Sequence, residues 1–218
     1  MRGLILRDLL SYWRRSSKSA VITDICLFVF FMLLGMRSQA TAQLDAYGYL
    51  LLCMPLGTGS VVPTIKDNDM VSNGGAALRY LPFLDRQIVL ARFLAVGCVG
   101  LYHTVLMSVF CVVHGLLYGV FDAGTYILLL IFGWMTGLVL SSINLVTAYL
   151  GSNNAVAVVY LLVIALSIGA YLGLLFMDID IYAILSSQLL LWGAAVFVTA
   201  MVVVLCFVIS VKAYGRRR

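Results

Sequence analysis

The stretch that decides the fold is AGTYILLLIFGWMTGLVLSSINLVTAYLGSNNAVAVVYLLVIALSIGAYLGLLFM, residues 123–177, which contains no charged side chain. A membrane-spanning helix needs about 20 apolar residues, so this stretch is too long for one span and long enough for two. The run Gly151-Ser152-Asn153-Asn154 supplies a turn signal near its middle. The sequence therefore predicts two membrane-spanning helices, at about 125–150 and 155–176.

The rest of the chain follows the same pattern. Hydrophobic residues make up 63% of the 218 residues and the mean hydropathy is +1.08, whereas soluble domains are roughly 45–50% apolar. No small-residue cleavage site follows the first apolar run, so we expect that run to stay in the mature protein. The fold class is predicted as all-α: residues 1–218 form one integral membrane domain, a six-helix bundle. The four further spans are expected at about 21–36, 47–65, 93–120 and 189–211.

The basic residues predict the orientation of this bundle. All but one of the 14 Lys and Arg residues fall near the N-terminus, between the second and third spans, or at the C-terminus, and Arg37 is the exception. Since Lys and Arg are enriched in cytoplasmic loops, we expect both termini and the 66–92 segment to be cytoplasmic. The net charge of +5 is then explained by topology, which removes the support for a nucleic-acid partner.

Residues 1–19 are predicted to form an amphipathic elbow helix. Such a helix, with Trp and Leu opposite its basic side chains, lies flat at the level of the lipid headgroups. The alternative is that the segment only anchors the topology. The apolar face holds Ile5, Leu6, Leu9, Leu10, Tyr12 and Trp13, and the polar face holds Arg7, Asp8, Ser11, Arg14, Arg15 and Lys18.

Residues 66–92 form the longest polar stretch and are predicted to be a cytoplasmic coupling segment. We expect a short helix at 76–80, a break at Leu81-Pro82, and a second helix over 86–92 that Asp85 caps and that continues into the third span. Two short helices beside a membrane domain make a docking surface for a soluble partner. The alternative is a solvated connector.

The sequence carries no catalytic signature. It lacks the GxxxxGK[ST] phosphate-binding loop, HExxH, GxSxG and CxxC. We therefore expect no enzyme activity, cofactor or metal site in this chain. All 5 cysteines lie within predicted spans, where thiols act as small apolar groups.

Four polar residues within the predicted spans are candidates for lining a transport path. Ionisable groups at membrane depth are functional candidates by default, and these are Asp24, His103 and His114. Asn144 adds a polar stripe on the fourth span. The alternatives are that the histidines are packing residues, that Asp24 lies at the headgroup boundary, and that Asn144 serves helix packing.

Two motifs carry a resemblance to a known family. The opening MRGLILRDLL (1–10) and the pair RYLP (79–82) and DRQIVLARFL (85–94), with Asp67-Asn68-Asp69 after the second span, resemble the small six-span permease subunits of bacterial type-2 ABC exporters. The resemblance implies two permease subunits, the same or related, in a bacterial plasma membrane. It also implies separate ABC ATPase subunits that bind ATP and Mg²⁺ and drive export.

The resemblance further implies that the segment after the second span contacts the ATPase. An amphipathic peptide, lipid or drug is the expected substrate. The competing interpretation is a non-transporting membrane protein, such as an immunity or sensor subunit that binds a toxin or peptide; an intramembrane enzyme has less support. The residues predicted to contact the ATPase are Asp67, Asn68, Asp69, Met70, Asn73 and Arg79.

Overall fold

The computed structural model describes residues 2–71, 83–151, 153–176 and 189–216, and its regular elements are all helices. Five described stretches are long and apolar enough to cross a membrane: Lys18–Gly35, Gln39–Asp69, Asp85–Tyr118, Ala123–Leu150 and Trp192–Arg216, and a shorter apolar stretch covers Asn154–Leu166. The predicted all-α membrane bundle is confirmed. In chain order the helices are α1 (Arg2–Gly35), α2 (Gln39–Gly48), the π-helix η1 (Tyr49–Cys53), α3 (Met54–Val71), α5 (Asp85–Tyr118), α6 (Ala123–Leu150), α7 (Asn153–Phe176) and α9 (Leu189–Arg216).

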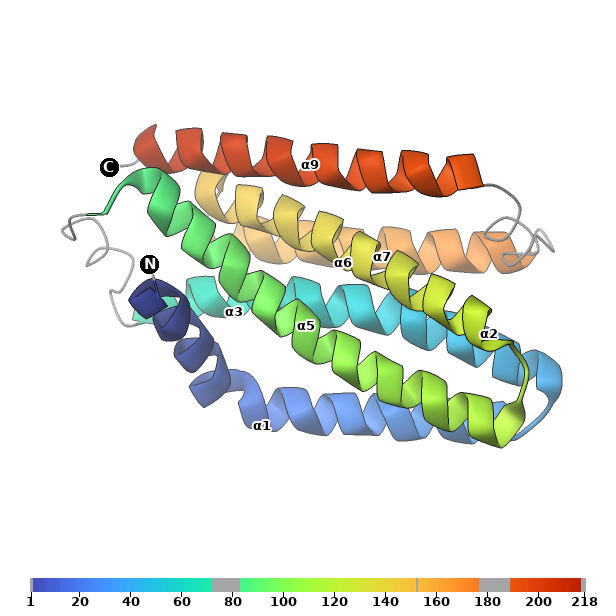
Figure 1. Cartoon of the computed structure of the whole chain (residues 1–218). Helices are drawn as coiled ribbons and strands as arrows, with labels where there is room; N and C mark the ends of the chain where they lie inside the picture. The colour runs from blue at the N-terminus through green and yellow to red at the C-terminus, as the bar shows by residue number, and fades with distance from the viewer. Residues whose placement is uncertain (1, 72–82, 152, 177–188, 217–218) are drawn as a thin grey trace.

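The long helices lie side by side, and both ends of the chain are found at the same end of the bundle (Figure 1). The last turns of α3 and the first turns of α5 lie there as well. The described residues of the basic clusters also lie at this end of the bundle. We therefore call it the basic end. Helix α6 packs most extensively against α3 and α9. The arrangement brings the N-terminal part of α1, the end of α3 and the start of α5 together at the basic end.

The elbow and the first span form one continuous helix, α1, whose N-terminal part runs at an angle to the remainder (Figure 1). Leu6, Leu10 and Trp13 are exposed, as expected for a surface that meets lipid. Asp8, which the pattern placed on the polar face, is instead buried, as is Tyr12. The helix therefore presents part of its polar face to the protein, because the charged partners of Asp8 lie there.

The second predicted span, 47–65, lies within a longer helical run. The run begins at Gln39, where the Ser38 side chain accepts a hydrogen bond from the Thr41 N–H, and it ends at Val71. The first residues of the predicted coupling segment are thus the last turn of α3. Residues 72–82, including Asn73, Arg79 and the predicted helix at 76–80, lie outside the described residues.

Two further boundaries differ slightly from expectation. Helix α5 is capped by Leu84, with extended backbone (φ −69°, ψ 144°), so Asp85 is its first residue and not its cap. Asp85 still lies in the first turn, where a carboxylate favours the positive end of the helix dipole. At the other end of α5, Gly119 adopts the left-handed conformation (φ 57°) that ends the helix before α6 begins.

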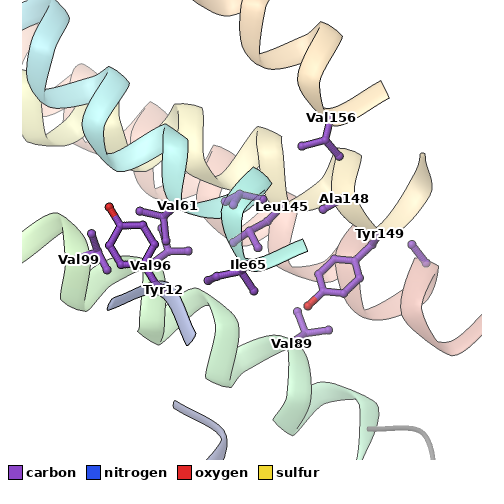
Figure 2. Packing of buried hydrophobic residues seen from close by; sticks show 12 residues of the cluster. Tyr12, Val61, Ile65, Val89, Val96, Val99, Leu145, Ala148, Tyr149 and Val156 are labelled. Atoms are coloured by element: carbon purple, nitrogen blue, oxygen red, sulfur yellow. The ribbon is translucent and has the colours of Figure 1, made fainter. Parts of the chain in front are cut away.

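Two large apolar clusters hold the described helices together, and a smaller one joins Leu4 of α1 to Ile88 and Ala91 of α5. The large cluster at the basic end surrounds α3 and includes Val61, Ile65, Val96 and Leu145 (Figure 2). The other large cluster is aromatic, with the rings of Tyr49 and Phe110 stacked at 3.9 Å between centroids. Large apolar side chains also cover the outer surface, and a lipid bilayer is the solvent that tolerates them. Examples are Ile22, Leu101, Leu116, Leu166, Phe197 and Val204.

Candidate functional site

A partly buried ion-pair network lies at the basic end. Arg7 Nη2 of α1 is 2.6 Å from Asp8 Oδ1 and 3.3 Å from Asp69 Oδ1 of α3. Arg92 of α5 donates to Asp69, and its Nε lies 3.9 Å from Asp8 Oδ2. The Arg92 guanidinium also lies over the ring of Tyr149 of α6, at 5.7 Å from its centroid. The network joins α1, α3, α5 and α6 through charged and aromatic contacts.

The balance of charge explains how this network tolerates burial. The side chains of Asp8 and Arg92 are only 3% and 9% exposed, and isolated charges at such depth are costly. Two guanidinium groups oppose two carboxylates, so the cluster is neutral as a whole. Removing one member would leave an uncompensated buried charge, which typically costs about 3–5 kcal/mol.

The end of α3 makes two more contacts with distant elements. Lys66 Nζ donates to the Gly151 carbonyl in the turn between α6 and α7, at 3.0 Å. Asn68 Nδ2 donates to the Ser11 carbonyl of α1, at 3.1 Å. Residues 66–69 therefore connect α3 to α1, α5 and the α6–α7 turn.

The structure describes four of the six residues predicted to contact an ATPase. Asn68 contacts α1 and Asp69 contacts α1 and α5, and the side chain of Asp67 is exposed. Met70 lies in the last turn of α3. Asn73 and Arg79 lie outside the described residues.

The predicted elbow residues also divide. Arg7 belongs to the ion-pair network, and Arg14 is exposed. Trp13 is half exposed and packs edge-on against Tyr102 of α5, at 5.9 Å between ring centroids. Arg15 lies on the same helix, α1. The elbow thus has one part that binds the protein and one that faces outward.

A cavity of about 380 Å³ with both polar and apolar side chains in its wall lies between α1, η1, α3, α5 and α7, and we call it the polar cavity. Asp24 and His103, two of the predicted path-lining residues, meet there, with 3.9 Å between Asp24 Oδ2 and His103 Nε2. Burial, reinforced by the Asp24 carboxylate, raises the pKa of the Tyr12 phenol, so this group stays neutral. Hydroxyl groups complete the polar part of the wall: Tyr12, Ser19, Thr23, Ser60, Thr64 and Tyr160.

The backbone of α3 fixes the position of the imidazole. A Cβ atom at Gly57 would lie 2.7 Å from His103 Nε2, so only glycine lets the ring lie against the helix. On the other side of the ring, Nδ1 lies 3.0 Å from the Val99 carbonyl. Close approach and hydrogen bonding together fix the ring, with Nε2 beside both Gly57 and Asp24.

The other two predicted path-lining residues contact neighbouring helices. His114 Nδ1 lies 2.6 Å from the Tyr126 hydroxyl, and the ring stacks on Phe110 in the aromatic cluster. Asn144 Nδ2 donates to the Gly59 carbonyl of α3, at 3.3 Å. Neither residue lines the polar cavity. No group of three or more metal-binding side chains occurs among the described residues.

Several residues of these two sites had not been singled out from the sequence. The sequence pattern places Asp8 on the polar face of the elbow helix and Arg92 at the end of the predicted 86–92 helix, but it does not pair them. It gives the cavity residues Ser60, Thr64 and Tyr160 no role. The sequence does show charged residues on several helices at about the same membrane level, which is a signal for ion pairs. Deciding which charges pair requires the register of one helix against another, which the sequence does not provide.

Comparison with known protein families identifies a matching family. A family model described as "ABC-2 family transporter protein" matches residues 3–214, nearly the whole chain. No curated protein and no solved structure matches the chain.

Proposed function

This chain belongs to the ABC-2 family of transporter proteins and is a permease component, and we propose that it exports an amphipathic substrate using ATP hydrolysed by separate partner subunits. Nucleotide and Mg²⁺ would bind to those partners. The complete transporter would contain a second permease subunit, the same or related, in a bacterial plasma membrane. The basic end would face the cytoplasm, following the distribution of Lys and Arg.

The observation that carries this proposal is the ion-pair network of Arg7, Asp8, Asp69 and Arg92. The end of α3 leads directly into the segment expected to meet the ATPase, with Asp67 exposed beside it. A partner that pushes on this segment moves the end of α3. Because the network is partly buried and joins α1, α3 and α5, those helices would move with it as one unit.

The test uses the chain purified by an affinity tag together with its ATPase and reconstituted into vesicles. We expect Asp69→Asn and Arg92→Gln to retain the ATPase but to lower ATP-driven substrate transport at least about tenfold, since the loss of one buried charge disrupts the link. The matched controls are Asp122→Asn and Arg86→Gln, which change exposed charges of the same type outside the network. Transport should persist in any control complex that still holds the ATPase.

Two results would contradict the proposal in different ways. Well-folded Asp69→Asn and Arg92→Gln variants with full transport would remove the coupling role of the network. Absence of any co-purifying ATPase, together with absence of ATP-driven transport, would remove the export function itself and favour an immunity or sensor protein.

A further inference from the structure

The polar cavity points to the chemical class of the molecule that this protein binds. We propose that the Asp24–His103 cavity binds the ammonium group of a cationic amphipathic molecule, whose hydrocarbon part lies against the outer surface of the bundle. The identification of this molecule as the exported substrate rests on the proposed export function. Its binding to the cavity does not depend on that function.

Two hydrogen-bond acceptors face each other across the cavity. His103 Nδ1 lies against the Val99 carbonyl, which can only accept, so Nδ1 carries the proton of the neutral imidazole and Nε2 is an acceptor. Asp24 Oδ2 is buried and has no hydrogen-bond partner among the described residues, although Tyr102 donates to the carboxylate. At 3.9 Å, Oδ2 and Nε2 are too far apart for a mutual hydrogen bond.

An ammonium group fits this arrangement because it has several N–H donors and a positive charge. One N–H can reach the Asp24 carboxylate while another reaches His103 Nε2, and the hydroxyls of Ser60 and Thr64 offer further acceptors. Within the described part of the chain no Lys or Arg side chain lines the cavity, so no fixed positive charge there opposes a cation. A phosphate or carboxylate ligand would meet the Asp24 carboxylate and is disfavoured.

The size and surroundings of the cavity indicate an amphipathic molecule. Its volume of about 380 Å³ is near the lower end of ligand pockets, which is enough for a headgroup or one side chain and not for a whole peptide. On α1, Ile22 and Ile25 flank Asp24 and are 61% and 57% exposed. A hydrocarbon chain attached to the bound ammonium would therefore run along an apolar, lipid-facing surface.

The test measures binding to the purified full-length chain in detergent, without an ATPase, by thermal unfolding and titration. The probes are dodecylammonium, the uncharged dodecanol, and dodecyltrimethylammonium, which is cationic but has no N–H donor. We expect dodecylammonium to raise the unfolding temperature most. Asp24→Asn should weaken its binding by about tenfold or more, the usual value of a charge-assisted hydrogen bond.

Asp45→Asn is the matched control, since Asp45 is a buried carboxylate of α2 that does not line the cavity. It should leave dodecylammonium binding unchanged. Equal binding to Asp24→Asn and the unaltered chain would overturn the proposal, and so would equal binding of dodecanol and dodecylammonium.

A second measurement needs no variant and covers a failure of Asp24→Asn to fold. An alkylammonium probe with a photoreactive diazirine beside the nitrogen should label Tyr12 or Tyr160, which line the cavity, as read by mass spectrometry. Labelling confined to residues outside the cavity would overturn the proposal. Because no ATP is used, failure here is distinct from failure of transport, which the vesicle assay reports separately.

Discussion

At the scale of single residues, Asn144 of α6 compensates for a hydrogen bond that Pro63 removes from α3. Pro63 has no N–H, so the carbonyl four residues earlier, that of Gly59, has no donor within the helix. Asn144 of α6 donates its side-chain N–H to that carbonyl. In lipid such a carbonyl finds no water, which makes this contact structural.

This pairing predicts that Asn144→Leu destabilises the protein by about 1 kcal/mol, the usual value of a hydrogen bond between membrane helices. In a Pro63→Ala background the cost should be smaller, because the alanine introduced there supplies the helical N–H to the Gly59 carbonyl. Unfolding in detergent mixtures measures both values. Thr147→Val is the control, since the Thr147 hydroxyl bonds within its own helix, to the Ile143 carbonyl. Equal costs in both backgrounds would contradict the pairing.

The surroundings of Gly57 and Gly97 predict that substitution by alanine has opposite effects on stability at the two positions. A Cβ at Gly57 would meet the His103 ring at 2.7 Å, whereas a Cβ at Gly97 of α5 meets nothing within 4 Å. We expect Gly57→Ala to destabilise by about 1–3 kcal/mol through overpacking, and Gly97→Ala to be neutral or stabilising by about 0.5–1 kcal/mol. Unfolding in detergent mixtures measures the stability of both variants. If Gly57→Ala is as stable as Gly97→Ala, the His103 ring is not held against Gly57.

At the scale of helices, α1 combines two environments along one continuous element. Asp8 and Tyr12 face the protein, while Leu6, Leu10 and Trp13 are exposed. The exposed side chains have the character of an interfacial helix, whose apolar side chains enter the headgroup region. The N-terminal part of α1 is thus held by ion pairs on one side and by lipid on the other.

This arrangement predicts the depth of Trp13. In vesicles, with Trp134 and Trp192 replaced by Phe, the fluorescence of Trp13 should be quenched by lipids brominated near the headgroup and weakly by aqueous acrylamide. The single-tryptophan variant that keeps Trp134, on the lipid-facing side of α6, is the comparison and should respond to deeper bromine positions. Strong acrylamide quenching of Trp13 would show that the elbow stands in water.

The positions of the long helices could be predicted well from the sequence, but the contacts between them could not. Hydropathy and charge located the long helices because each signal is local to the element. The sequence pattern does not indicate the early start of the second helical run. The capping residues Ser38 and Thr41 lie before the apolar run that marks the span. The Arg92–Asp69 pair joins residues of different helices, and no periodicity within one helix specifies its register against another.

At the scale of the whole molecule, the two ends of the bundle differ in charge. The end opposite the basic end presents Asp122, exposed, at the start of α6, and the Thr125 hydroxyl that donates to it lowers the pKa of its carboxyl. It therefore stays ionised at neutral pH. Because the basic clusters lie at one end and only Arg37 lies away from them, the positive-inside rule predicts that the basic end faces the cytoplasm.

The orientation can be tested by labelling in intact cells with a membrane-impermeant maleimide, after the 5 native cysteines are replaced by alanine. We expect Asp122→Cys to be labelled from outside, since it is exposed at the end opposite the termini. Arg86→Cys, exposed at the start of α5, should be labelled only after the membrane is opened. Labelling of Arg86→Cys in intact cells would place the end of α3 and its ion-pair network away from cytoplasmic ATP, and no ATPase could then act through it.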